Sequence, residues 1–150
     1  MEFQEENFAV YQLLVKLDMA GVENMKADFA AAKTGTDDDK YKFALGIYGL
    51  VTTPGIEAAL PGLTKTIVDN TLEQALAVFE DTAGRGHPHA ALMAAWCRAS
   101  GIGCIEDKTI AKQWLDQSDD AVGPSDFSRE LRSRISTVMV VFPPQKPKAP

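Results

Sequence analysis

The sequence is 150 residues long, with 45% hydrophobic and 24% charged residues, and this length suits one domain with one hydrophobic core. Its net charge of −6 argues against binding to nucleic acids or anionic membranes, because both attract proteins through lysine and arginine side chains. The longest apolar run near the C-terminus, residues 138–142, is far shorter than the ~20 residues that a membrane-spanning helix needs. We therefore expect a soluble protein that binds neither nucleic acid nor a membrane.

The N-terminus is acidic and is followed by no small-residue cleavage site, which predicts a cytoplasmic protein without a secretory signal. In that setting Cys97 and Cys104 are expected to be reduced thiols. Charge is distributed unevenly, since residues 1–81 carry 14 acidic and 6 basic side chains while residues 82–150 carry 7 and 9. The acidic first half suits a basic partner, and it equally suits a surface that only keeps the protein in solution.

Three helices are predicted in the first 50 residues, because apolar side chains recur there at three- and four-residue steps. They span residues 3–19, residues 22–33 and about residues 38–50. Gly21 separates the first two helices, which we expect to form a hairpin. Residues 36–39 supply N-capping side chains and negative charge to the start of the third helix.

The next segment, residues 56–70, has an interrupted helical pattern, because Pro61 and Gly62 fall within it. We expect an irregular insertion in this place. Helical periodicity then returns at Thr71 and stops at Gly84, which predicts a helix between these residues.

Three further helices are predicted in the second half of the chain, at about residues 88–100, 107–117 and 125–142. Ser125 is the expected N-cap of the last helix. The buried stripe of that helix is predicted to consist of Phe127, Leu131, Ile135 and Val138. Residues 143–150 are rich in proline and are expected to form an extended, mobile tail. No run of residues alternates with a period of two, so we predict an all-α fold.

An internal period of 36 residues relates two of these helices. In each, an alanine is followed by two large apolar residues, so that the helices can approach closely at the alanine while the bulky pair fills the space beside it. The equivalent pairs are Ala75 and Ala111, Val78 and Trp114, and Phe79 and Leu115.

Two further patterns accompany this period: Ala-x-x-Gly-His-x-x-Ala over residues 83–90, and Gly-x-Gly-x-x-x-Asp-x-x-x-Ala-x-x-Trp over residues 101–114. On these residues the chain resembles the Sel-one-like repeat, a relative of the tetratricopeptide repeat, and the resemblance is closest over residues 70–117. The leucine-glycine pair and the tyrosine of that family's first helix are replaced here by Ala94, Ala95 and Arg98.

The resemblance implies a short α/α solenoid of antiparallel helix pairs with a capping helix at each end, because terminal repeats must cover an exposed apolar face. We expect one domain over residues 1–142, with a degenerate repeat at about residues 22–86 and a clear repeat at about residues 83–117. The helix at residues 125–142 is the expected C-terminal cap.

Arrays of this family bind other proteins on a concave face lined by the first helix of each repeat. The resemblance therefore implies a non-catalytic binding protein without a cofactor. We expect the contact surface to include Asp39, Ile47, His89, Met93 and Trp96, because aromatic residues and methionine are favoured anchors at interfaces. The alternative for Trp96 is that it covers the core beneath the last helix.

Small size, acidity and the lack of catalytic motifs together favour a bacterial immunity or chaperone-like protein that neutralises a toxin or secreted effector, with a basic partner as the preferred target. A general regulatory scaffold is the first alternative. The second is a metal-binding module that uses His87, His89, Cys97 and Cys104, although zinc sites need four converging ligands and this spacing fits no familiar zinc pattern. The paired carboxylates lie at predicted helix ends or in loops, where capping and solvation explain them.

Overall fold

The computed structural model describes residues 3–141, with side chains as far as residue 136. The described part of the chain is helical throughout and contains no strand, so the predicted all-α class is confirmed. None of its helices combines the length and the apolar composition that crossing a membrane requires. The predicted tail at residues 143–150 lies outside the described residues. The elements are η1 (Glu5–Asn7), α1 (Ala9–Leu17), α2 (Val22–Thr34), α3 (Asp37–Val51), α4 (Ile56–Ala59), α5 (Lys65–Gly84), α6 (Pro88–Ser100), α7 (Lys108–Val122) and α8 (Asp126–Val141).

The long helices from α3 onward begin at side chains that cap them. In α3, the Thr36 hydroxyl accepts a hydrogen bond from the Asp39 backbone N–H at 3.3 Å, and the Asp39 carboxylate accepts one from the Thr36 N–H at 3.0 Å. This reciprocal pair satisfies two backbone donors that a bare helix end leaves unpaired. Ser125 caps α8 by accepting from the Ser128 N–H at 3.0 Å, as its position in the sequence predicts.

Two helix boundaries differ from those expected. The expected insertion at residues 56–70 contains the single-turn helix α4, and α5 already begins at Lys65 because Thr64 caps it through the Ile67 N–H at 3.2 Å. The fifth helix is therefore 20 residues long and not the shorter helix expected from Thr71. At the other end, α7 continues past the expected Gln117 to Val122.

The first predicted helix is also divided. The chain turns through η1 before α1 begins at Ala9, and α1 ends at Asp18, which takes a left-handed backbone conformation with φ 49°. Two apolar residues before α1, Phe3 and Phe8, are nearly fully buried in spite of lying outside a regular α-helix. The aromatic side chains in this part of the chain are thus placed by packing and not by helical periodicity alone.

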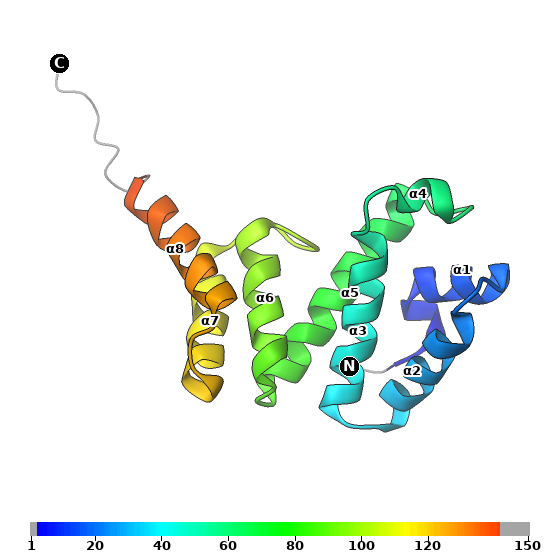
Figure 1. Cartoon of the computed structure of the whole chain (residues 1–150), viewed down its shortest axis with the longest axis horizontal. Helices are drawn as coiled ribbons and strands as arrows, with labels where there is room; N and C mark the ends of the chain where they lie inside the picture. Colours follow the sequence, from blue (N-terminus) through cyan, green and yellow to red (C-terminus); the bar gives the residue numbers. More distant parts are fainter. Residues whose placement is uncertain (1–2, 142–150) are drawn as a thin grey trace, which may run out of the picture.

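From α2 onward, each long helix packs mainly on its neighbours along the chain. Contacts join α2 to α3, α3 to α5, α5 to α6 and α6 to α7, while α8 lies against both α7 and α6. Figure 1 shows these helices side by side in chain order, with α1 and α2 at the N-terminal end of the row and α8 at the other.

The N-terminal end of the row is held by a cluster of aromatic rings. The Phe8 and Phe43 rings meet edge to face with centroids 5.1 Å apart, and Tyr11 stacks on Phe29 at 4.5 Å. Phe3 completes the cluster. Large rings bury much apolar area and gain a further 0.5–1.5 kcal/mol or so from such geometries, so this cluster fixes α1, α2 and α3 on one another.

The middle of the row is joined by a polar contact across three consecutive helices. The Glu80 carboxylate on α5 accepts two hydrogen bonds from the Arg98 guanidinium on α6, at 2.7 and 2.8 Å. It accepts a third from the Trp114 indole N–H on α7, at 2.9 Å. About three quarters of the Glu80 and Arg98 side chains are shielded from solvent, which makes this bidentate pair stronger than an exposed one. The contact sets the spacing of α5, α6 and α7.

Replacing Arg98 with alanine should lower the free energy of unfolding by about 1–3 kcal/mol, because the largely buried Glu80 carboxylate then loses two charged donors. Urea denaturation of the two proteins measures the difference. Lys65→Ala is the matched control, since it also removes a cation from an ion pair, but one in which the lysine side chain is 88% exposed. Equal midpoints for Arg98→Ala and Lys65→Ala would contradict this account.

Candidate functional site

The residues predicted to form a contact surface lie at different depths. Ile47 is fully buried in the main core, so its assignment to an exposed contact surface is wrong. The sequence alone does not determine which face of α3 carries Ile47. The packing of α3 on its neighbouring helices directs this side chain inward. Asp39 is partly exposed, but its carboxylate is engaged in the cap of α3.

His89 lies near the N-terminal end of α3, where the first turns of α3 and α6 meet. His87 Nε2 lies 3.1 Å from the Asp38 carboxylate, and the Tyr41 ring packs against the rings of both histidines, at 4.6 Å from His87 and 6.5 Å from His89. His87 also caps α6, since its Nδ1 accepts from the Ala90 N–H at 3.0 Å. His89 itself is exposed. This end of α3 and α6 is thus a structural joint with one exposed histidine beside it.

Trp96 and Met93 lie further along α6, and both are partly buried. The Trp96 indole N–H donates to the Tyr48 hydroxyl on α3 at 2.9 Å, while its ring contacts Phe127 on α8 with centroids 5.8 Å apart. Trp96 therefore covers the core beneath the last helix, which was the alternative considered for it. One part of the Trp96 ring also lines a pocket.

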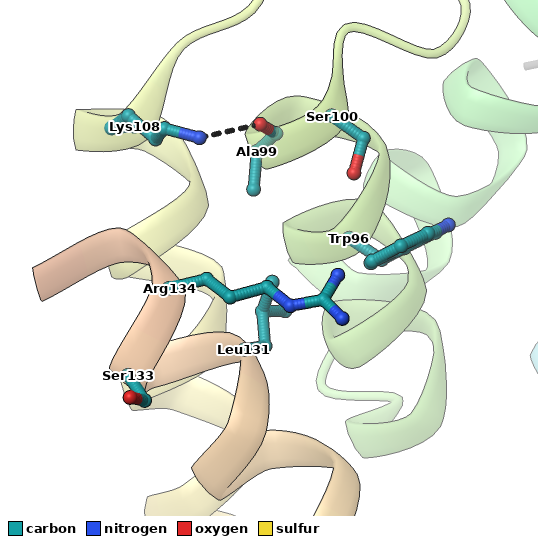
Figure 2. A pocket seen from close by; sticks show the side chains of 7 residues that line it. All are labelled: Trp96, Ala99, Ser100, Lys108, Leu131, Ser133 and Arg134. Carbon is teal, nitrogen blue, oxygen red and sulfur yellow. Dashed lines mark hydrogen bonds between the residues drawn. The ribbon is translucent and has the colours of Figure 1, made fainter. Parts of the chain in front are cut away.

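A pocket of about 410 Å³ opens between α6, the start of α7 and α8. Trp96, Ala99 and Leu131 supply its apolar wall, and Lys108 and Arg134 stand at its edges (Figure 2). Ser100 and Ser133 complete the lining. Figure 2 shows the Arg134 side chain extending from α8 across the pocket toward the Trp96 ring.

A smaller pocket of about 120 Å³ shares Trp96, Leu131 and Arg134 with the first and adds Phe127 and Glu130. The two together form one groove, which we call the α6/α8 groove. Phe127 is 42% exposed, so the prediction that it belongs to the buried stripe of the last helix is wrong. Leu131 and Ile135 of that stripe are buried as predicted, and the side chain of Val138 lies outside the described ones.

The rotation of α8 explains why Phe127 is exposed. Arg132 reaches to α7, where it pairs with Asp116 and Asp119, each at 2.8 Å. Leu131 and Ile135 fill the core beneath α7 and α6. With these side chains directed to α7 and the core, Phe127 and Arg134 are left facing Trp96.

Among the side chains that the structure describes, two cations and no carboxylate line the larger pocket. The Arg134 guanidinium carbon lies 5.9 Å from the Trp96 ring centre, within the range of a cation–π contact, and its Nε pairs with Glu130 at 3.2 Å. Lys108 donates to the Ala99 carbonyl at the end of α6, at 2.8 Å, and lies 3.3 Å from Glu106. The groove thus combines an apolar wall with two cations and the Glu130 carboxylate at its rim.

The histidines and cysteines do not assemble into a metal site. Among the described residues, no group of three or more His, Cys, Asp or Glu side chains is placed to hold a metal ion. The Cys104 thiol instead lies 3.6 Å from the Cys97 carbonyl, and the buried Cys97 side chain packs in the core. Burial raises the pKa of the Cys97 thiol to about 12 and also raises that of Cys104. Both cysteines therefore stay protonated, and so weakly reactive, near neutral pH.

Sequence reasoning missed the residues of α8 and of the start of α7 that build the groove. Arg134, Lys108 and Phe127 belong to no repeat pattern, and their role depends on how the last helix is rotated. The signal that was available is Arg134, which stands one helical turn after Leu131 in the sequence. Comparison of the chain with protein-family models, curated proteins and solved structures finds no match.

Alkylation should modify Cys104 before Cys97, because Cys97 is the more deeply buried thiol and has its pKa raised further. Brief treatment of the native protein with iodoacetamide at pH 8, followed by peptide mass spectrometry, gives the order. The urea-unfolded protein is the control, in which both thiols should react at similar rates. Faster labelling of Cys97 in the native protein would contradict the described packing.

Proposed function

We propose that this chain is a non-catalytic protein-binding module, built as a short α/α solenoid of Sel-one-like helix pairs with a capping helix at each end. The supporting observation for the solenoid is the packing of each long helix on its neighbours along the chain. The 36-residue period adds to it, since Ala75 and Ala111 are both fully buried and so are Phe79 and Leu115. Two of the three equivalent positions in α5 and α7 thus have equivalent environments, as repeats require, while Trp114 is less buried than its counterpart Val78.

The observation that carries the proposed binding function is the α6/α8 groove. It places the Trp96 ring, in the wall of a pocket of about 410 Å³, beside the exposed Phe127 of the smaller pocket of about 120 Å³. Aromatic residues and arginine are enriched among the side chains that dominate binding energy at protein interfaces, and Arg134 lies over Trp96. An exposed phenylalanine beside a concave surface is a feature that a partner would cover.

The predicted contact surface is accordingly revised. Trp96 stays in it as the residue shared by both parts of the groove, and Phe127 and Arg134 are added. His89 and Asp39 lie at the other end of α6 and α3, beside the joint between His87 and Asp38, and form a separate surface. Immunity against a toxin or effector stays a prediction from the sequence, alongside a regulatory scaffold, because the groove does not distinguish between them.

Phe127→Ser should abolish partner binding without unfolding the protein, because Phe127 is half exposed and contributes to the groove more than to the core. The measurement is affinity capture from the native host with the wild-type chain and the variant, followed by mass spectrometry. Leu45→Ser is the matched control, since Leu45 is a similarly exposed apolar residue, at 37%, on α3.

A partner retained by the wild type and by Leu45→Ser, but lost by Phe127→Ser, is the expected result. Circular dichroism checks that both variants remain folded. A partner that is retained by Phe127→Ser and lost by Leu45→Ser would place the binding surface on α3 and contradict the proposal.

A further inference from the structure

We infer that the α6/α8 groove binds a segment of a protein partner in which a bulky apolar side chain stands beside an aspartate or glutamate carboxylate. This inference rests on the proposed binding function and specifies the chemistry of the partner. The groove lies in the C-terminal half of the chain, whereas most acidic side chains lie in the N-terminal half. The negative net charge of the whole chain therefore does not describe the charge of this site.

The carboxylate follows from the charges that line the pocket. Lys108 and Arg134 are its only ionisable lining residues among those described, and both are cationic. Each has one acidic neighbour outside the pocket, Glu106 for Lys108 and Glu130 for Arg134. Glu106 and Glu130 are each more than half exposed, and so is Arg134, so solvent screens these surface charges. Glu130 also lines the smaller pocket of the groove, whereas Lys108 is mostly shielded beside the apolar wall.

Arg134 has the geometry to receive a carboxylate. Its contact with Glu130 uses Nε, at 3.2 Å, which leaves the two terminal nitrogens directed across the pocket (Figure 2). A guanidinium presents its donors in a planar fork that matches the two oxygens of a carboxylate. Because the Trp96 ring already lies 5.9 Å from the guanidinium carbon, the cation is held in place before a ligand arrives.

The bulky apolar side chain follows from the wall and the size of the pocket. Leu131 is almost fully buried at the base of the pocket. Because Ala99 is small, it leaves space between Trp96 and α8. A volume of about 410 Å³ lies at the lower end of the range for ligand pockets, about 300–1,000 Å³, and suits one large side chain with its neighbours. The exposed Phe127 ring extends the apolar surface beyond the pocket.

The test is selection of peptides from a random dodecapeptide display library on the full-length chain, with removal of peptides that also bind Phe127→Ser. Enriched sequences should place aspartate or glutamate within about three residues of Phe, Trp, Leu or Met. Binding of the best peptide is then measured by titration calorimetry, and its affinity should fall as salt rises, because a charged contact is screened.

Arg134→Gln tests the cation directly. It should weaken peptide binding about tenfold or more, while leaving the helical content of the chain unchanged. Arg129→Gln is the matched control, because it makes the same change of charge on α8 at a residue that lines neither part of the groove. It should leave the affinity within twofold of the wild type.

Three results would overturn the inference. Enriched peptides without an acidic residue, or with affinity unaffected by Arg134→Gln, would refute the carboxylate while leaving the proposed binding groove intact. Failure to enrich any peptide that depends on Phe127 would refute both. A dimer detected by light scattering that Phe127→Ser dissociates would show that a second copy of the chain occupies the groove.

Discussion

One carboxylate, Glu80, holds the central part of this molecule in register. It projects from α5 and accepts hydrogen bonds from Nε and Nη2 of Arg98 on α6 and from the Trp114 indole N–H on α7. Alanines at the helix contacts let these helices approach, but alanine surfaces alone permit sliding. The directional bonds of Glu80 fix the relative positions of three consecutive helices. Because Trp96 lies on α6, its position at the groove depends on this contact.

The helix starts were predictable from the sequence because they depend on local chemistry. Thr36, Asp107 and Ser125 each accept a hydrogen bond from a backbone N–H three residues later, and their residue types identify them as caps. His87 makes the same contact without being a usual capping residue, and Pro88 predicted the start of its helix. The start of α5 was misjudged because the nearby proline and glycine obscured the cap at Thr64.

The direction in which side chains face was less predictable, because it depends on packing between distant parts of the chain. Ile47 was expected at a surface and is buried, whereas Phe127 was expected in the core and is exposed. In α8 the decisive contacts are those of Arg132 with Asp116 and Asp119 on α7, which fix the rotation of the helix. The periodicity within α8 does not specify those partners. The apolar residues of the groove could therefore be recognised in the sequence, but their assembly into a groove could not.

Hydrogen exchange of the chain, alone and bound to its captured partner, tests whether the α6/α8 groove is the binding surface. Residues 96–100 of α6 and residues 127–134 of α8 contribute most of the groove. We expect the partner to slow hydrogen exchange in these two segments and to leave exchange in α1 and α2 unchanged. Slower exchange confined to the N-terminal helices, with no change along α6 and α8, would contradict the assignment of this groove as the binding surface.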